Sequence, residues 1–268
     1  MARLLLIGLV GAALLVCSSV PARAAPIVAD DFSYPDGPLA GNDGGTAGSG
    51  SSWSGPWATD SGGGWNVSGG QITADGQTAD ERYFSTGFSG SPATPFLYFS
   101  ARFTASEGSD WDGPAMYLME DATRDGLWFG LIWDVEEVGV LQPYVELFGG
   151  ESATVGGSYS AGQEVLIVGK LEFNTGGGGM EQLQIWVNPT NVETGGQTHM
   201  PIIGDIGWTT PDLVYLESYS ADSLFSFMDD VRIGTTWADV GPVPEPSTLL
   251  LLAAGLLGLL CYAWRKRK

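Results

Sequence analysis

Between its two terminal apolar segments, the chain is interrupted at short intervals by glycine. This pattern limits the possible fold more than any other feature of the sequence. The 40 glycines cluster between short apolar runs without a fixed period, as turns do in an all-β domain. No spacing typical of an amphipathic helix extends over a useful length before residue 247. About twelve runs of strand length therefore predict an all-β fold, an antiparallel β-sandwich, over residues 25–242.

The first third of this region combines strands with a long loop. Residues 30–34 predict a short first strand that runs into a turn, and residues 65–73 predict a later strand. Between them, residues 41–64 are rich in Gly and Ser yet carry Trp53 and Trp57. A disordered linker would not hold these tryptophans, so we expect the loop to pack on the domain.

Later runs indicate a buried sheet. Residues 127–133 (LWFGLIW) have no polar residue, which is typical of a central strand with Trp128 and Trp133 in the core. Residues 164–174 and 182–188 flank four glycines and predict a hairpin. In its second strand, alternation should separate one face from the other, with Leu183, Ile185 and Val187 opposite Gln182, Gln184 and Trp186.

The last 26 residues are built differently. Residues 247–264 are uncharged and almost wholly apolar, and as a helix they would be about 27 Å long, close to a ~30 Å hydrocarbon core. A buried helix of a globular protein is the alternative, but a helix apolar on all faces suits lipid better. We expect one transmembrane helix, held with its C-terminus in the cytoplasm by a basic cluster of Arg265, Lys266, Arg267 and Lys268.

A short stiff motif, Pro244-Glu245-Pro246, precedes this helix. The tripeptide, the apolar helix and the terminal basic cluster, in that order, resemble the PEP-CTERM sorting signal of bacterial exported proteins, here over residues 243–268. The resemblance implies that an exosortase, a membrane cysteine peptidase, processes the chain near the tripeptide. The protein would then be a single-pass inner-membrane intermediate before it reaches the cell surface or extracellular matrix.

The N-terminus agrees with export. Arg3 precedes an apolar run at residues 4–16, and Ala22-Arg23-Ala24 offers an A-x-A site with cleavage after Ala24. Residues 1–24 therefore predict a signal peptide, in helical form, for the Sec machinery and signal peptidase. Lipidation of Cys17 is excluded because Val16 stands where such signals need a small residue.

The exterior between the two segments is strongly acidic. Residues 25–243 hold five Lys/Arg and 30 Asp/Glu, a formal net charge of −25. This surface repels nucleic acid and anionic lipid and suits divalent cations or neutral glycans, although solubility alone also explains it. The exterior has no cysteine, and its single histidine, His199, lies in a polar Gly/Thr stretch typical of a loop.

Two places in the exterior add a family resemblance. Residues 31–34 (DFSY), followed by residues 53–57 (WSGPW), resemble the start of concanavalin A-like jelly-roll domains. Residues 228–234 (MDDVRIG) are similar to the last strand of laminin-G-like domains of that superfamily. The resemblance implies two antiparallel sheets with the first and last strands adjacent.

Glycanases of this superfamily place an acid and a nucleophile on one face of a strand. The nearest match is Asp134 with Glu136, which would share a face. Ile132 stands where the laminarinase-type pattern has a glutamate, so the pattern is broken at a position that the mechanism requires. An acidic turn between two strands is the simpler interpretation.

Two further kinds of site remain candidates. Tryptophans in loops can stack on sugar faces, and the candidates for glycan binding are Trp53, Trp57, Trp111 and Trp208. If the terminal strands are neighbours, Asp229 and Asp230 lie near Asp30, and their oxygens suit Ca²⁺. No EF-hand loop is present in the sequence.

The sequence therefore predicts an exported surface or matrix protein without catalytic activity. Its sorting depends on the C-terminal motif, glycan is its candidate ligand, and Ca²⁺ is the one cofactor considered. The alternative is an extracellular polysaccharide hydrolase of the jelly-roll glycanase type.

Overall fold

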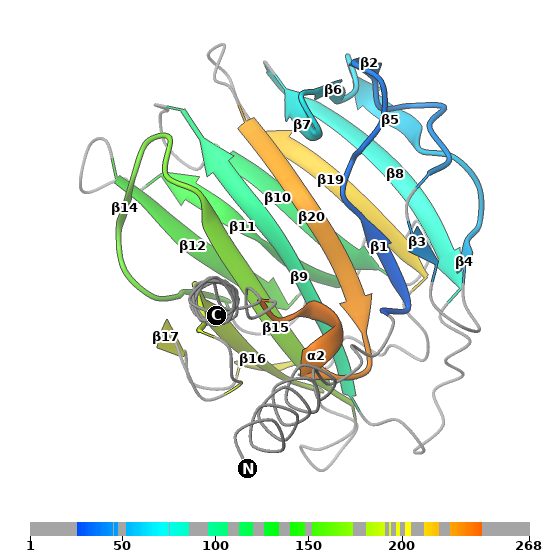
Figure 1. The fold of residues 1–268 in the computed structure, drawn as a ribbon. Coiled ribbons are helices and arrows are strands. Elements are labelled where there is room, and N and C mark those ends of the chain that lie inside the picture. Colours follow the sequence, from blue (N-terminus) through cyan, green and yellow to red (C-terminus); the bar gives the residue numbers. More distant parts are fainter. Residues whose placement is uncertain are drawn as a thin grey trace, which may run out of the picture.

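Two antiparallel sheets pack face to face and form a sandwich around one core (Figure 1). The structure, a computed structural model, describes residues 26–44, 46–47, 52–74, 76–85, 96–106, 113–119, 126–133, 140–147, 152–173, 181–190, 193, 197–198, 202–204, 212–219 and 226–242. The predicted antiparallel β-sandwich is confirmed. Every described strand belongs to one of the two sheets, and all of them lie within residues 25–242.

The first sheet, called sheet 1, contains 11 of the described strands. Its main path runs β17 (Gln197–Thr198), β16 (Glu181–Val187), β15 (Val165–Glu172), β9 (Phe96–Ala105), β20 (Ser226–Gly234), β7 (Gln71–Ala74), β6 (Asn66–Ser68) and β2 (Gly37–Pro38). Three short strands lie off this path: β1 (Val28–Asp30), β3 (Thr46–Ala47) and β18 (Ile202–Gly204). Because β1 pairs with β20, the predicted adjacency of the first and last strands is confirmed.

The second sheet, sheet 2, contains nine of the described strands. Its path runs β13 (Ser152–Thr154), β12 (Val140–Leu147), β11 (Gly126–Trp133), β10 (Gly113–Met119), β19 (Leu213–Tyr219), β8 (Thr78–Ser85) and β4 (Ser52–Trp53), with β14 (Tyr159–Ser160) on β12 and β5 (Ala58–Gly62) on β8. The apolar run that predicts a central strand forms β11, between β10 and β12, as expected.

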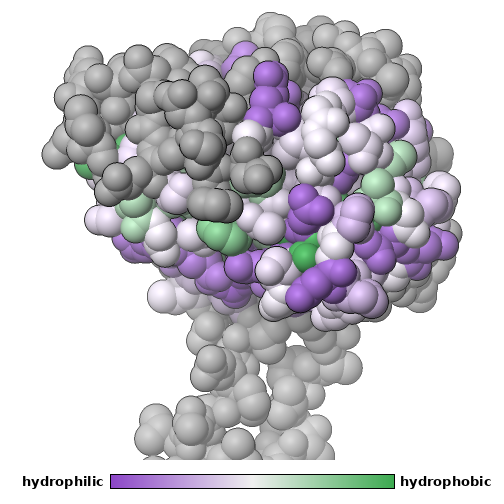
Figure 2. All heavy atoms as spheres, turned by 90° about the horizontal axis from the view of Figure 1, so that it is seen from above, coloured by the Kyte–Doolittle hydropathy of each residue, from purple (hydrophilic) through white to green (hydrophobic). Residues whose placement is uncertain are grey.

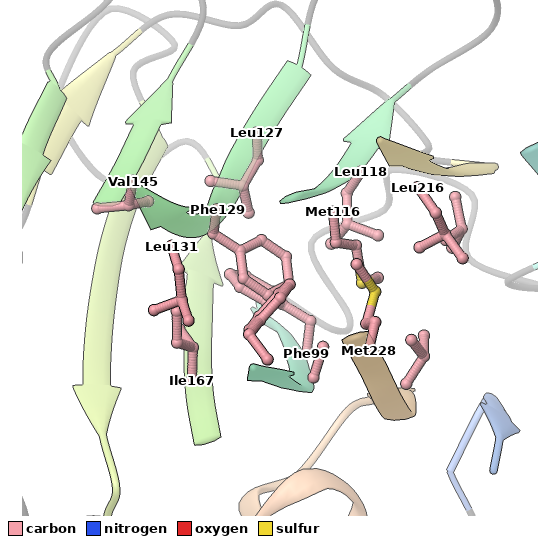
Figure 3. Packing of buried hydrophobic residues seen from close by; sticks show 14 of the residues in the cluster. Phe99, Met116, Leu118, Leu127, Phe129, Leu131, Val145, Ile167, Leu216 and Met228 are labelled. Carbon is pink, nitrogen blue, oxygen red and sulfur yellow. The ribbon is translucent and has the colours of Figure 1, made fainter. Parts of the chain in front are cut away.

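Alternate side chains of both sheets meet between the layers (Figure 3). Phe129 of β11 lies with its ring centroid 4.7 Å from that of Phe99 and 5.7 Å from that of Phe103, both on β9. All three side chains are fully buried, and each such burial contributes roughly 1.5–3 kcal/mol to stability. The core thus fixes which side of each strand faces outward.

The hairpin predicted around the four glycines is confirmed, since β15 and β16 pair in antiparallel register. Its second strand also separates its two faces as predicted. Leu183, Ile185 and Val187 enter the main core, whereas Trp186 packs on the opposite side of sheet 1.

Two predictions in the first third of the exterior are wrong. Residues 65–73 are not one strand, because a turn at Gly69 and Gly70, with φ of +64° and +85°, joins β6 to β7. Two successive positive φ values are a conformation that glycine adopts readily. The first strand ends at Asp30 rather than continuing to residue 34, since Phe32 takes a φ of +49°.

A short helix missed by the sequence analysis, α2 (Trp237–Val240), lies on the outer side of sheet 1. Its Trp237 ring meets the Trp186 ring at 5.1 Å, and Ser100 Oγ donates a hydrogen bond to the Val240 carbonyl. Within the part of the chain that the structure describes, no helix is long and apolar enough to cross a membrane. The expected signal and transmembrane helices fall outside that part.

Candidate functional site

Four aromatic side chains form a continuous row on the outer face of sheet 2, and this row is called the aromatic strip. It consists of Tyr215, Tyr117, Trp128 and Tyr144, from β19, β10, β11 and β12. Cross-strand register places Tyr215 opposite Tyr117, and Tyr117 opposite Trp128. Successive ring centroids along the strip lie 5.4, 6.2 and 4.6 Å apart. Edge-to-face packing at these distances stabilises the row.

The period of two along each strand explains why these rings face outward. The neighbours Leu216, Phe129 and Val145 are buried in the main core, so the residues beside them must lie on the other face. Tyr117, Trp128 and Tyr144 are partly exposed there, whereas Tyr215 is 4% exposed. The strip therefore offers three accessible rings on a rigid sheet.

A carboxylate accepts a hydrogen bond from the hydroxyl of each tyrosine in the strip. The Tyr117 hydroxyl donates to Glu217 Oε2 at 2.6 Å and the Tyr144 hydroxyl to Glu146 Oε2 at 3.0 Å. The Tyr215 hydroxyl likewise donates to Asp60 Oδ2 at 3.0 Å. These bonds fix the rings in place and keep carboxylate groups beside them.

Burial raises the pKa of Tyr144 above its usual value of 10.0, with the nearby Glu146 carboxylate acting in the same direction. The hydroxyl therefore stays protonated at neutral pH and remains a donor. A protonated, hydrogen-bonded tyrosine can orient a polar ligand. It is poorly suited to act as a base at neutral pH.

The sequence prediction for Trp128 is wrong. Trp133 is buried as expected, but Trp128 lies on the outer face between Leu127 and Phe129, which both enter the core. A run without polar residues hides this alternation. The signal that could have located the strip is the repeated Y-x-E pattern at residues 144–146 and 215–217, where aromatic and acidic side chains share one face of each strand.

Two of the four tryptophans proposed for glycan binding lie in the described residues, and neither belongs to the strip. Trp57 is 1% exposed and its Nε1 donates to Asp30 Oδ2 at 3.0 Å, so its ring presents no face to solvent. Trp53 is partly buried, with the Arg82 guanidinium 4.4 Å from its ring centroid. The expectation of an exposed platform is therefore wrong for Trp57, whereas glycan binding by the partly buried Trp53 stays a prediction. Trp111 and Trp208 lie outside the described residues.

Arg82 is the centre of that packing. Its side chain is fully buried and forms an ion pair with the equally buried Asp30, at 3.0 Å. It also donates to the carbonyls of Gly44 and Gly55 and pairs with Asp43 at 2.9 Å. The network joins β8 and β1 to Asp43, Gly44 and Gly55, so its role is structural. The prediction of one long loop over residues 41–64 is wrong, because this stretch also contains β3, β4 and β5.

The proposed calcium ligands lie at a bulge in β20. Asp230 pairs with Arg232 at 2.5 Å and with Arg102 at 3.6 Å, and burial raises the pKa of Asp229 to about 6. Asp30, expected nearby, is engaged with Arg82 instead. Among the described residues, no group of three His, Cys, Asp or Glu side chains is arranged to hold a metal ion. Calcium at Asp229 and Asp230 stays a prediction.

Several other predicted residues lie outside the part that the structure describes. They are the signal cleavage site Ala24, the sorting motif Pro244, Glu245 and Pro246, the basic cluster at residues 265–268, the acidic pair Asp134 and Glu136, and His199.

The described residues thus form an all-β exterior with an aromatic strip on one sheet. The tail that follows is identified by comparison: residues 242–268 match the model of the PEP-CTERM protein-sorting motif. The chain carries this sorting signal, as predicted from its tripeptide, and is an exported protein whose processing by exosortase the motif implies. No curated protein matches the chain.

Solved structures similar to this chain are distant in sequence. An alginate lyase mutant in complex with alginate tetrasaccharide is 12% identical, with 80% of this chain and 98% of that chain covered, at a TM-score of 0.49. The botulinum neurotoxin serotype C1 binding domain is 8% identical over 76% of this chain and 48% of that chain, at 0.48. A structure from work on endo-acting O-glycanases of human gut microbiota is 10% identical over 79% of this chain and all of that chain, at 0.47.

Proposed function

We propose that this protein is a non-catalytic component of the cell surface or extracellular matrix that binds glycan through its aromatic strip. The signal peptide and Sec machinery export it, the tail holds it in the inner membrane, and exosortase processes it near Pro244-Glu245-Pro246. The sandwich then acts outside the cell as a glycan-binding module.

The observation that carries the glycan proposal is the aromatic strip itself. The apolar face of a sugar packs on an aromatic ring, and the carboxylates beside Tyr117 and Tyr144 can accept hydrogen bonds from sugar hydroxyls. Viewed from one end, the surface of the described residues is mainly hydrophilic, with hydrophobic residues in small separate patches (Figure 2). A surface of this kind is typical of a domain that is exposed to water.

The dimensions of the strip favour an oligosaccharide over a single sugar. Its three accessible rings lie on three adjacent strands, and two gaps of ~4.8 Å give a width of about 10 Å. Rings on rigid strands also lose little freedom on binding, which favours affinity.

Binding to a glycan array, followed by calorimetry with the best ligand, tests the proposal on residues 25–242. We expect Trp128→Ala to weaken binding at least tenfold, about 1.4 kcal/mol, without lowering the melting temperature much, because the ring is partly exposed. Phe96→Ala is the matched control, since Phe96 is a partly buried aromatic residue on sheet 1. Equal binding by both variants would remove the strip from the proposal. Degradation of a bound glycan would show an enzyme instead.

A further inference from the structure

The few basic residues of the exterior are separated from the aromatic strip. Only five Lys/Arg occur in residues 25–243. Arg82 is fully buried between the sheets. Three others belong to strands of sheet 1: Arg102, Lys170 and Arg232. Only Arg124, outside the described residues, remains for the rest of the exterior.

The three bases of sheet 1 are held on that sheet by carboxylates of their own. Arg102 pairs with Glu164 at 2.6 Å, and Lys170 pairs with Glu172 at 2.6 Å. Lys170 also lies 4.5 Å from the ring centroid of Phe96. These contacts keep the positive charges on the layer opposite to the strip.

The outer face of sheet 2 carries the opposite charge. Glu217, Glu146 and Asp60 accept bonds from the tyrosines of the strip, and Glu81 lies opposite Tyr215 in the register. Of the five bases of the exterior, at most Arg124 can lie near these four carboxylates, so the formal charge at the strip is −3 or more negative. Within a Debye length of ~8 Å, this field acts directly on any charge of a bound ligand.

From this charge separation we infer the class of glycan that the strip binds: an oligosaccharide with free amino groups, such as a glucosamine polymer. The inference rests on the proposed function. An ammonium group is attracted by the carboxylates and by the faces of Trp128 and the tyrosines. Uronates, sialic acids and sulfated sugars would bring like charge to a surface without enough bases to compensate it.

Calorimetry with three oligosaccharides of matched length tests the inference on residues 25–242, at pH 6 and 50 mM salt. The ligands are a chitosan hexamer with free amines, its fully acetylated neutral counterpart and an alginate hexamer. We expect the chitosan hexamer to bind at least tenfold more tightly than the neutral hexamer and the alginate hexamer not to bind. In 0.5 M NaCl the preference should largely disappear.

Two double variants separate a specific site from general attraction to an acidic protein. Glu146→Gln with Glu217→Gln should weaken chitosan binding at least tenfold and binding of the neutral hexamer by a clearly smaller factor, because the amide oxygen of glutamine still accepts a hydrogen bond from a sugar hydroxyl but carries no charge. Glu164→Gln with Glu172→Gln removes the same charge from sheet 1 and should leave both unchanged. An equal loss in the two double variants would overturn the inference, because the attraction would then belong to the whole surface.

The remaining outcomes distinguish the two proposals. Equal affinity for the chitosan and neutral hexamers, both lost in Trp128→Ala, would refute the charge class and leave glycan binding intact. Tighter binding of alginate would also refute the charge class. If no glycan of any charge binds, the proposed function fails, and the inference fails with it.

Discussion

Replacing Arg82 with methionine tests whether the buried network holds residues 41–64 to the sandwich. The substitution keeps an unbranched side chain of similar length and removes the charge. It leaves the buried Asp30 carboxylate without its cation, and the carbonyls of Gly44 and Gly55 lose their donor. Breaking a buried ion pair on one side typically costs 3–5 kcal/mol.

The structure narrows this range. Asp30 keeps three other donors, the Phe32 amide at 2.9 Å, the Tyr34 hydroxyl at 2.5 Å and Trp57 Nε1 at 3.0 Å. Because these bonds remain, we expect removal of the cation beside Asp30 to cost ~3 kcal/mol, the lower limit of that range. Two lost hydrogen bonds to carbonyls add roughly 0.5–1.5 kcal/mol each. We therefore expect Arg82→Met to lower the free energy of unfolding by about 4–6 kcal/mol.

Urea unfolding of residues 25–242, followed by tryptophan fluorescence, measures this loss. Trp53 and Trp57 contact the network directly, so their emission should also shift if residues 41–64 detach in the native state. Arg102→Met is the matched control, because Arg102 and its partner Glu164 are substantially exposed, at 32% and 55%, and such pairs contribute about 0–1 kcal/mol. A loss below 1 kcal/mol for Arg82→Met would refute the role given to the network.

Two further predictions concern the bulge in β20. Burial raises the pKa of Asp229 from 3.8 to about 6, so the folded state binds this proton more tightly than the unfolded state. Its stabilising effect is complete below pH 4 and is lost as the pH rises through 6. Solvent screening at a partly exposed side chain reduces the effect to about 1 kcal/mol, so Asp229→Asn should be more stable than the native chain at pH 7.5 by that amount. Urea midpoints between pH 4 and 8 measure this, and parallel pH profiles of the two proteins would contradict it. Arg102 and Arg232 already pair with Asp230, so Ca²⁺ can bind at the predicted site only by displacing them. If the site exists, calorimetry on residues 25–242 should show binding heat that is abolished in Asp229→Asn, whereas no heat and an unchanged melting temperature would remove it.

Local patterns were sufficient to predict much of the sandwich. Alternation assigned Leu183, Ile185 and Val187 to the core, and glycine clusters marked the hairpin between β15 and β16. Alternation and glycine clusters depend on neighbours in the chain, which a single sequence records. The adjacency of the first and last strands is a long-range pairing, and it was predicted only through the resemblance of the two ends of the exterior to a known superfamily.

The candidate site depends on the register between strands far apart in the chain, which local patterns do not specify. Tyr117 and Tyr215 are opposite one another only because β10 pairs with β19. Trp128 lies in an apolar run, where period-two alternation cannot tell inside from outside. Trp57 looked like an exposed loop residue because its partner Asp30 is 27 positions away. Long-range pairing therefore explains why Trp57 was predicted to be exposed and why the aromatic strip was not predicted.

Delivery of the sandwich outside the cell and its release from the sorting tail leave a record at both ends of the mature chain. Mass spectrometry of the protein isolated from its own host reads both ends. We expect a mature chain that begins at Ala25 and ends near Pro244, without the basic cluster at residues 265–268. A chain that retains an intact C-terminus at Lys268 would contradict processing at the motif.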